Sequence, residues 1–549
     1  MTDALVIALA QLNPTVGDIQ GNLTRIREAR AASGGADLLV CAELALIGYP
    51  PEDLVMRPAV IEATRRAVEE LAADTRSGPA ILVTAPWRDG LAIYNAVILL
   101  DGGSIRTVRY KHELPNYGVF DEKRVFAAGP LPDPVDFRGV RLGVPICEDI
   151  WYPAVVAHLA KQGAEILIVP NGSPFEREKV GQRIALSTER VRETGLPLVY
   201  INQVGGQDEL VFDGGTFVIN ADRQLVVRFP VWAEKTHATR WVRSSSGWAC
   251  APQDLEPLPD EPGNTYQGLM VGLRDYVNKN RFPGVLLGLS GGIDSALTAV
   301  VAVDALGPER VLGVRLPSRF TSDESQTDAD VSADRLGMRL ETIPIAGVVD
   351  AVEQAVGPLF AGRPRDITEE NMQARARGLL LMAVSNKFGS MLLTTGNKSE
   401  MSVGYATLYG DMCGGYSVLK DLYKTEVYAL AEWRNRCVPK GALGPAGEVV
   451  PGNVLTKAPT AELRPNQKDQ DTLPEYAELD AMLTGLVEQE RSVDEIAGDG
   501  HARDIVSRTQ NMLFTAEYKR RQAPPGVKTS SRSFGRDRRY PITNRFRDR

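Results

Sequence analysis

The amino-acid sequence predicts an α/β protein with two domains. The chain has 549 residues, which is too long for one ordinary hydrophobic core. Short apolar runs alternate with segments of helical periodicity in both halves. Residues 244–264 carry several prolines and acids, a composition typical of a semi-stiff linker. We therefore expect one domain over residues 1–243 and a second over residues 265–549.

Composition narrows the class of protein. The formal net charge of −8 gives no reason to expect a nucleic-acid partner. The five cysteines are odd in number and form no Cys-x-x-Cys pair, which argues against a disulfide framework or a cysteine zinc site and favours a reducing compartment. No apolar run approaches a membrane span, and residues 4–10 have the pattern of a strand, not of a signal peptide. We expect a cytoplasmic protein without a membrane partner.

The first half is dense in short apolar runs. This density favours an α/β sandwich over a single nucleotide-binding sheet. Helical periodicity is clearest in residues 21–32 and 58–73. The strand candidates are residues 5–10, 38–42, 80–84, 92–100, 142–146, 165–170, 198–202, 216–220 and 225–229.

Three residues follow predicted strands in this half and have the chemistry of an amidase site. A cysteine nucleophile such as Cys147 needs a base to remove its proton, and Glu43 can supply one. It also needs a positive group near the developing oxyanion, and Lys111 can supply it while lowering the pKa of the thiol. Taken singly, each has a more ordinary interpretation: a buried cysteine is usually a small apolar residue, and a charged residue after a strand is usually solvated.

The segments around these residues resemble the nitrilase superfamily, in particular its glutamine-amidase branch. They read Glu43 followed by Gly48-Tyr49-Pro50, Lys111-His112-Glu113-Leu114-Pro115, and Gly143-Val144-Pro145-Ile146-Cys147-Glu148-Asp149. The resemblance implies an α-β-β-α sandwich with Glu43, Lys111 and Cys147 as catalytic residues. It also implies that Tyr117, Ser173 and Lys179 bind glutamine. Thr216 stands where this branch leads us to expect serine, a conservative difference.

The second half opens on a candidate phosphate-binding loop. Residues 285–289 predict a buried strand, Ser290-Gly291-Gly292 a turn, and the following residues a helix. Such a turn directs backbone N–H groups and the helix dipole at one point, which suits phosphate. No Lys-Ser/Thr pair follows the glycines, as it would in a Walker A loop. The loop is therefore better suited to a pyrophosphate that leaves as one unit.

Further strands predict a doubly wound parallel sheet in this half. They are residues 311–317, 340–345 and 391–395, with helical segments between them. Ligands of such a sheet bind at the C-terminal strand ends, where Asp294 and Glu400 both lie. Singly, each acid is more simply a helix cap or a solvated residue. Together with the loop, they favour a Mg²⁺ site.

Four motifs in order resemble the NAD synthetase family. They are Ser290-Gly291-Gly292-Ile293-Asp294-Ser295, Gln373-Ala374-Arg375-x-Arg377, Thr395-Gly396-Asn397-Lys398-Ser399-Glu400 and Pro459-Thr460-Ala461-Glu462-Leu463. Fused behind an amidase half, they make the whole chain similar to the glutamine-dependent branch of that family.

The resemblance implies ATP, Mg²⁺, glutamine and deamido-NAD as ligands, and a homo-oligomer formed through the synthetase half. The residues implied to bind ATP are Gly288, Leu289, Ser290, Gly291, Gly292, Ile293, Asp294, Ser295 and Thr395. Those implied to bind deamido-NAD are Asn371, Glu400 and Lys519, and the metal ligands are Asp294 and Glu400.

The residues alone leave two other functions open. One is a glutamine-dependent ligase of the same loop class with a different acceptor. The other is an amidase whose second domain only senses a nucleotide. The arginine-rich tail after Phe534 is typical of a solvated or nucleic-acid-attracting extension, but Pro541-Ile542-Thr543 favours a docked strand.

Overall fold

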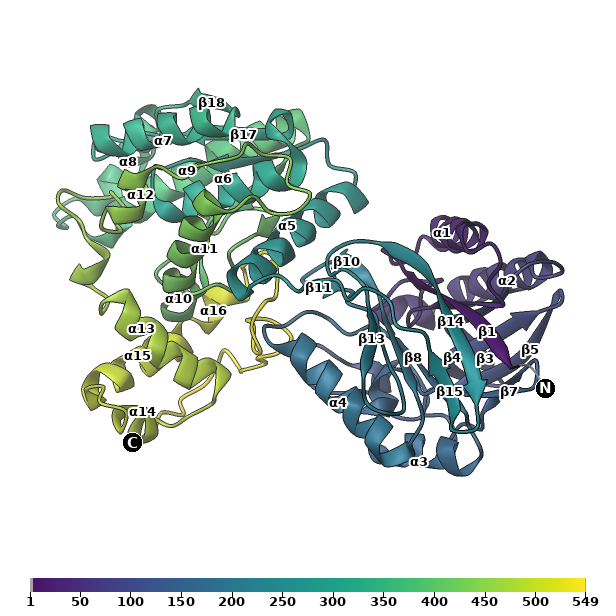
Figure 1. Cartoon of the computed structure of the whole chain (residues 1–549). Helices are drawn as coiled ribbons and strands as arrows, with labels where there is room; N and C mark the ends of the chain where they lie inside the picture. The colour runs from purple at the N-terminus through teal and green to yellow at the C-terminus, as the bar shows by residue number, and fades with distance from the viewer. Residues whose placement is uncertain (1–2, 549) are drawn as a thin grey trace. The chain divides into compact units, whose positions relative to one another are not determined.

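The computed structural model describes residues 3–548 and divides into two compact units, the first ending at Pro259 and the second beginning at Asp260 (Figure 1). Among the described residues no helix is both long and apolar enough to cross a membrane.

The first unit contains two stacked sheets. One has the strand order β15-β14-β1-β2-β3-β4-β5 and the other β13-β12-β9-β8-β7-β6. The first sheet consists of β1 (Ala4–Gln11), β2 (Leu38–Cys41), β3 (Ala80–Asp89), β4 (Ala92–Asp101), β5 (Ser104–Tyr110), β14 (Lys235–Ser244) and β15 (Gly247–Cys250). The second consists of β6 (Val135–Phe137), β7 (Val140–Gly143), β8 (Ile166–Asn171), β9 (Leu198–Asn202), β12 (Phe217–Ile219) and β13 (Leu225–Arg228). A separate hairpin joins β10 (Val204–Gln207) to β11 (Leu210–Asp213).

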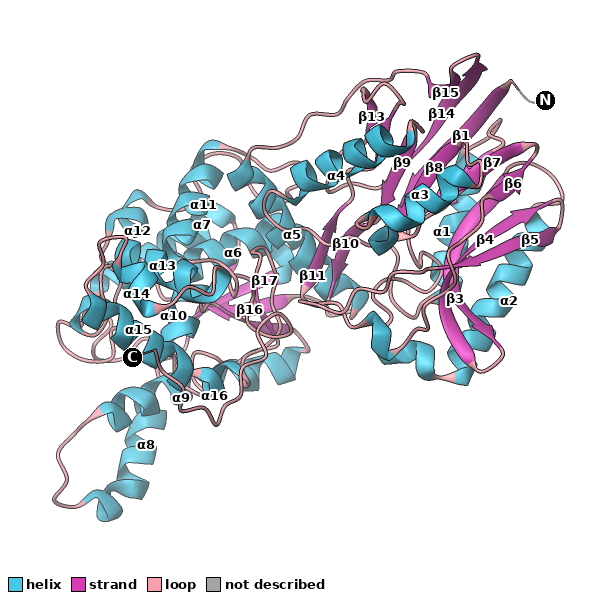
Figure 2. Cartoon of the chain, turned by 90° about the horizontal axis from the view of Figure 1, so that it is seen from below, coloured by secondary structure: helices cyan, strands magenta, loops and turns pink. Residues whose placement is uncertain are grey.

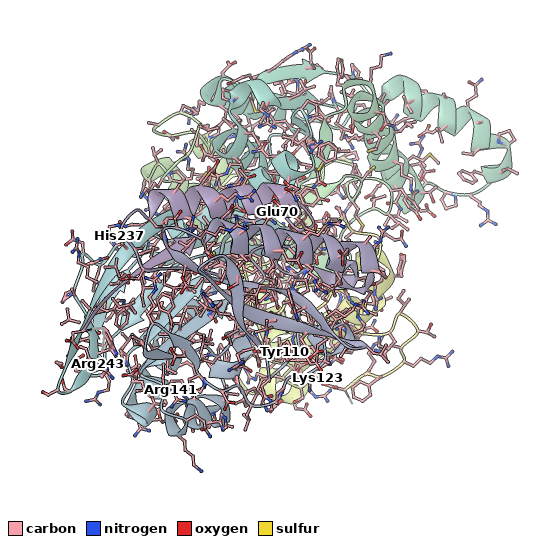
Figure 3. The ribbon with its side chains drawn as sticks, turned by 90° about the vertical axis from the view of Figure 1, so that its right-hand side faces the viewer. Glu70, Tyr110, Lys123, Arg141, His237 and Arg243 are labelled. Atoms are coloured by element: carbon pink, nitrogen blue, oxygen red, sulfur yellow. The ribbon has the colours of Figure 1, made fainter. Side chains whose placement is uncertain are left out.

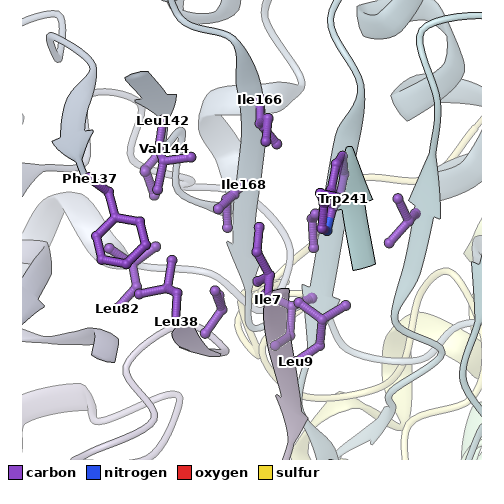
Figure 4. Packing of buried hydrophobic residues seen from close by; sticks show 14 of the residues in the cluster. Ile7, Leu9, Leu38, Leu82, Phe137, Leu142, Val144, Ile166, Ile168 and Trp241 are labelled. Carbon is purple, nitrogen blue, oxygen red and sulfur yellow. The ribbon is translucent and has the colours of Figure 1, made fainter. Parts of the chain in front are cut away.

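Alternation along the strands produces the layers. In β1, Ile7 and Leu9 face the other sheet, while Ala8 and Ala10 face the helices on the outside. Figure 4 shows Ile7, Leu9, Leu38 and Leu82 of the first sheet in the same core as Phe137, Leu142, Ile166 and Ile168 of the second, with Trp241 at one side.

Four helices cover the outer faces of the two sheets. Helices α1 (Ile19–Ala32) and α2 (Pro58–Asp74) pack on the first sheet, and α3 (Pro153–Lys161) and α4 (Lys179–Thr194) on the second. Charged side chains such as Glu70 of α2, Lys123 and Arg141 are exposed on the surface of this unit (Figure 3). The predicted α-β-β-α sandwich is confirmed.

The predicted linker is longer than the observed one. Residues 247–250 form β15, which pairs with β14 inside the first sheet, and α5 (Glu261–Lys279) begins before residue 264. Trp248 and Cys250 are buried and alternate with exposed residues, which is the pattern of a half-buried strand. Only residues 251–260 remain between the regular elements.

The second unit is built on a five-stranded parallel sheet with the order β18-β17-β16-β19-β20. The strands are β16 (Val285–Gly288), β17 (Val311–Arg315), β18 (Arg339–Thr342), β19 (Met391–Thr394) and β20 (Tyr416–Ser417). The order runs outward to β18 and then returns to β19 on the other side of β16. Because crossovers are right-handed, this reversal places helices on both faces, and the predicted doubly wound fold is confirmed.

Helices make up most of the second unit besides the sheet (Figure 2). Beyond α5 they are α6 (Ile293–Leu306), α7 (Asp323–Leu336), α8 (Ala346–Val356), α9 (Ile367–Phe388), α10 (Lys398–Val403), α11 (Lys424–Arg436), α12 (Gly452–Thr456), α13 (Tyr476–Leu483), α14 (Val493–Ala497), α15 (Arg503–Thr515) and α16 (Glu517–Arg520). The C-terminal tail is docked, as expected, but Pro541-Ile542-Thr543 form no strand. The tail is held by side-chain contacts; for example, Asp548 accepts from the Val493 N–H at 3.0 Å.

Candidate functional site

Glu43 lies just beyond β2 with its side chain fully buried. Three donors hold its carboxylate. Asn95 Nδ2 and Lys111 Nζ donate to Oε1 at 2.8 and 2.6 Å, and the Gly172 N–H donates to Oε2 at 2.8 Å. These bonds fix the carboxylate in one orientation.

The Lys111 ammonium is enclosed between two carboxylates. Besides Glu43, both oxygens of Glu122 contact Nζ, at 3.0 and 2.9 Å, and Tyr49 donates to Glu122 at 2.9 Å. Burial alone would lower the pKa of Lys111, but Glu122 and Glu43 raise it well above its ordinary value. Burial raises the pKa of Glu122 to about 7, against the attraction of Lys111. The lysine therefore stays charged at neutral pH.

Cys147 begins a short 3₁₀ helix, η3 (Cys147–Ile150), in a strained conformation. Its φ of 45° lies in the left-handed region that a residue with a side chain rarely adopts. Burial and the charge of Glu43 raise the pKa of the Cys147 thiol well above its ordinary value, while Lys111 acts to lower it. The expected lowering of the thiol pKa by Lys111 is therefore present, but desolvation and the charge of Glu43 outweigh it.

Two of the residues expected to bind glutamine lie beside Glu148, the residue after Cys147. The Tyr117 hydroxyl donates to the Glu148 carboxylate at 3.0 Å. Lys179 begins α4, and its charge lowers the pKa of Glu148, although burial raises that pKa overall. Tyr117 is half exposed and can contact a small ligand from solvent.

Ser173, the third of these residues, is fixed by a buried ion pair. Arg183 Nη1 contacts both oxygens of Asp213, at 2.7 and 2.9 Å. The same guanidinium donates to Ser173 Oγ at 3.0 Å and to its carbonyl at 2.9 Å. Gly172, which binds Glu43, precedes Ser173, so this ion pair also steadies the loop that orients Glu43.

In the second unit a cavity of about 310 Å³ opens at the C-terminal ends of β16 and β19, where the strand order reverses. All the predicted loop residues from Gly288 to Ser295 line it, and so do Thr395 and Glu400. Asn371 and Lys519 do not line it.

The glycine loop presents a helix N-terminus to this cavity. Helix α6 starts at Ile293, and no side chain caps it. Ser290 accepts from the Gly292 N–H at 3.3 Å, and its hydroxyl lies 3.0 Å from that of Ser295. Gly291 has φ +82°, and a Cβ there would lie 2.1 Å from the Ser325 carbonyl. Only glycine fits, and the turn it makes is suited to an anion.

The two predicted metal ligands are bridged by a lysine. Lys424 Nζ contacts Asp294 Oδ2 at 2.5 Å and Glu400 Oε1 at 3.1 Å. Asn397 caps α10 and donates to Asp294 Oδ1 at 2.8 Å. Burial raises the pKa of Glu400 to about 7, an effect that Lys424 opposes and Asp294 reinforces. The acids predicted to share a site are thus brought together.

Asn371 and Lys519 meet at another segment, the loop of residues 404–411 that follows α10. The side-chain amide oxygen of Asn371, Oδ1, accepts a hydrogen bond from the Thr407 hydroxyl at 2.9 Å. Lys519 Nζ donates to the Gly404 and Ala406 carbonyls at 2.8 and 2.7 Å. Residues of the same loop, among them Ala406 and Gly410, line the cavity. The two residues therefore border the cavity through the loop.

The remaining sequence motifs converge on the same place. Gln373 on α9 donates to the Leu463 carbonyl at 2.9 Å. Glu462, with φ 50°, accepts from the Ser322 and Ser325 hydroxyls at 2.8 and 2.7 Å. Ser325 is the residue whose carbonyl requires glycine at position 291. The segment of residues 459–463 thereby lies against the glycine loop.

Sequence reasoning missed two residues of these clusters, Glu122 and Lys424. Both stand in charged stretches that look like ordinary surface segments. Charge balance was the only signal for them, because a buried Lys111 needs an acid, and two half-buried carboxylates such as Asp294 and Glu400 need a cation.

Comparison with known proteins assigns both units. Residues 6–243 match the family model of carbon-nitrogen hydrolases, and residues 265–523 match that of NAD synthase. The chain is 48% identical over 550 residues to the glutamine-dependent NAD(+) synthetase of Rhodobacter capsulatus, covering 100% of both chains. It is 47% identical to that of Xanthomonas campestris, covering 99% of this chain and 98% of the other.

A solved structure supports the same assignment. The glutamine-dependent NAD+ synthetase from Acinetobacter baumannii in complex with adenosine diphosphate is 40% identical and has a TM-score of 0.79. The match covers 98% of this chain and 99% of that one. Similarity at this level over both units confirms the predicted family and shows a glutamine-hydrolysing carbon–nitrogen ligase: the chain belongs to the glutamine-dependent NAD(+) synthetases.

Proposed function

We propose that each unit carries one half of this reaction on the residues described above. The first releases ammonia from glutamine, and the second uses ATP and that ammonia to convert the nicotinate carboxylate of deamido-NAD to the amide. The observation that carries the proposal is the presence of two buried lysine–carboxylate clusters in one chain. One lies beside a strained cysteine and the other beside a glycine loop.

Glutamine hydrolysis begins at Cys147. As its sulfur attacks the side-chain amide carbon of glutamine, Glu43 accepts the thiol proton, and Lys111 stabilises the oxyanion. The raised pKa of the thiol makes a base at the moment of attack necessary. The proton passes from Glu43 to the leaving nitrogen, ammonia departs, and a thioester remains. Water, deprotonated by Glu43, then releases glutamate and restores the thiol.

Tyr117, Ser173 and Lys179 hold the glutamine in this proposal. Their position beside Glu148 and beside the Gly172 loop supports the assignment. Lys179 supplies a positive charge for the substrate carboxylate, and the polar groups of Tyr117 and Ser173 supply hydrogen bonds.

Amidation requires a better leaving group than oxide. The nicotinate carboxylate oxygen attacks the α-phosphorus of ATP, pyrophosphate leaves, and an acyl adenylate forms. Ammonia then attacks the acyl carbon and displaces AMP. We assign the pyrophosphate to the loop from Gly288 to Ser295, with Lys424 as an added positive charge and Thr395 as a further ATP contact. Asn371, Glu400 and Lys519 bind deamido-NAD.

Asp294 and Glu400 would hold Mg²⁺. Their oxygens suit the ion, which is commonly held by one or two carboxylates together with substrate phosphates. Among the described residues no group of three or more His, Cys, Asp or Glu side chains is arranged to hold a metal alone, so phosphate oxygens would have to complete the site. When bound, Mg²⁺ neutralises the charge of the departing pyrophosphate.

We further propose a cytoplasmic homo-oligomer. Consumption of ATP and five free thiols support the compartment. The large apolar side chains that α9 leaves exposed, Ile367, Leu379 and Phe388, support association with a second copy through the synthetase unit.

Two variants test the assignment of glutamine hydrolysis to the first unit and of ATP-dependent amidation to the second. Cys147→Ala should lose NAD formation from glutamine but keep it with an added ammonium salt, because only the thiol chemistry is removed. Asp294→Ala should lose NAD and pyrophosphate formation with either nitrogen source, while glutamine hydrolysis persists. Supplying candidate acceptors singly identifies the acceptor. NAD formation from glutamine by Cys147→Ala at the normal rate would show that the nucleophile is misassigned.

A further inference from the structure

The single-turn helix α16 carries Lys519 but has little stability of its own. It spans only Glu517–Arg520, and one turn of helix is unfavourable in isolation. Its position must therefore be set by tertiary contacts. The side chains at its two ends, Glu517 and Arg520, are both buried and make those contacts.

Arg520 connects α16 to α10, the helix that carries Glu400. Its Nη1 donates to the Met401 and Ser402 carbonyls at 3.1 and 2.8 Å, and its Nη2 contacts Glu517 Oε2 at 2.8 Å. The carbonyls at the end of α10 carry partial negative charge, which favours a cation there. Arg520 thus ties α16 to α10, whose Glu400 and Met401 line the cavity.

The arginine-rich tail supplies the other contact. Arg538 is only 4% exposed, its Nη1 lies 3.0 Å from Glu517 Oε2, and its guanidinium lies 3.6 Å from the centre of the Tyr540 ring. Glu517 therefore faces two buried guanidinium groups, and partly exposed Arg521 contacts its other oxygen at 3.1 Å. Because Arg520 and Arg521 already contact Glu517, Arg538 is not needed to balance the charge of this carboxylate, and burying its guanidinium costs free energy. Its benefit must lie elsewhere than in neutralising Glu517.

That benefit is the placement of Lys519. The contacts of its ammonium with the Gly404 and Ala406 carbonyls use two of its three N–H donors and leave one for a ligand. Because Lys519 and Glu517 lie in the same helical turn, a shift of Glu517 moves the ammonium with it.

We propose that Arg538 is a positioning residue of the synthetase site, which holds α16 through Glu517 and so places Lys519 against the dinucleotide. The inference rests on the proposed binding of deamido-NAD by Lys519. It gives the tail a role that its composition did not suggest, since the arginine lies inside the fold and not in solvent.

Arg538→Gln in the full-length protein tests this role. The variant should fold, because Glu517 keeps Arg520 and Arg521 as partners. With ammonium as nitrogen source, KM for deamido-NAD should rise about 10-fold, in keeping with the loss expected from an ångström-scale misplacement. KM for ATP should stay within about 2-fold, because Glu517, Arg520 and Arg538 do not line the cavity that the ATP loop borders. Arg538→Lys should recover part of the loss, and Arg539→Gln, at an exposed neighbouring position, should behave as the unaltered protein.

A double variant separates positioning from general stability. If Arg538 acts through Lys519, Arg538→Gln should add little to the effect of Lys519→Met. Full additivity of the two effects, or equal rises in both KM values, would overturn the positioning role while leaving Lys519 as a ligand. An unchanged KM for deamido-NAD in Lys519→Met would overturn the assignment of Lys519 itself, and the positioning role with it.

Discussion

Replacing Lys424 by methionine tests whether the cluster beside the glycine loop is a cation site. Its ammonium contacts both Asp294 and Glu400, at 2.5 and 3.1 Å. At an effective dielectric constant of about 20, each attraction is about 5–7 kcal/mol before desolvation is subtracted. Removing one partner of a buried ion pair costs about 3–5 kcal/mol net. We expect a loss of that size in the free energy of unfolding of the synthetase unit.

The same substitution should make the protein respond to Mg²⁺. With Lys424 gone, a divalent ion is the available replacement for the missing charge. For a Kd of about 1 mM, about 10 mM MgCl₂ would restore about 1.4 kcal/mol. The unaltered protein should respond less, because its lysine competes for the same carboxylates. The assay is scanning calorimetry in EDTA and in MgCl₂, with the synthetase transition identified by its shift with ATP. A loss of 3–5 kcal/mol corresponds to a fall in Tm of about 10 °C.

Proton binding by Glu400 adds a pH dependence to this result. Its carboxyl pKa is raised to about 7 in the fold, so ionising it costs stability as pH rises through 7. Lys424 opposes that rise in pKa, and without it the cost grows. In EDTA the Lys424→Met penalty should therefore be larger at about pH 8.5 than at about pH 6. The double variant Lys424→Met/Glu400→Gln should lose most of the Mg²⁺ response. Lack of destabilisation in Lys424→Met, or a Mg²⁺ response that survives in the double variant, would refute the reasoning.

Three further predictions follow from the two sites. Glu122→Gln should lower glutamine hydrolysis about 100-fold, because the Lys111 ammonium loses one of its two carboxylate partners and is held less firmly. Ammonium-dependent synthesis should stay intact, and loss of both activities would contradict this prediction. Gly291→Ala should abolish pyrophosphate release with either nitrogen source, because the added Cβ would collide with the Ser325 carbonyl, while hydrolysis of glutamine continues. Normal ATP use by this variant would show that the loop is more pliable than its geometry indicates. ATP plus deamido-NAD should raise glutamate formation by a coupling of about 1–3 kcal/mol, measured with a non-reacting ATP analogue to separate binding from turnover, and equal rates in all conditions would rule the coupling out.

The sequence predicted the candidate sites best where residues able to act in catalysis or binding directly follow a predicted strand. Glu43 and the 288–295 loop follow buried apolar strands, and an apolar run that ends in such residues marks a site of an α/β fold. The strand β14 was missed, because Lys235, His237 and Arg240 break its apolar pattern. Its residues 235–242 pair with β1 along the whole length of β1, so the pairing partner and not its own composition makes it a strand.

Long-range partners were beyond the reach of the sequence. Glu122 meets Lys111 across a loop, and Lys424 meets Asp294 across 130 positions of chain, so local pattern gives neither pair. The net direction of the Cys147 pKa shift also lies beyond local sequence pattern. It depends on the depth of burial, which weighs more than the nearby charge, and depth is a property of the packed fold.

The two active sites use the same electrostatic arrangement. In each, one buried ammonium contacts two carboxylates: Lys111 with Glu43 and Glu122, and Lys424 with Asp294 and Glu400. One carboxyl of each cluster, Glu122 or Glu400, has a pKa raised by burial to about 7.

In both clusters this carboxyl therefore loses its proton near neutral pH, while the lysine stays charged. What distinguishes them is the neighbouring group. Beside Cys147 the cluster supplies Glu43 as the proposed base for the thiol proton. Beside the glycine loop its carboxylates favour a cation that arrives with phosphate. In the proposed mechanism, the difference between hydrolysing an amide and activating a carboxylate thus lies in the neighbour of each cluster and not in the cluster itself.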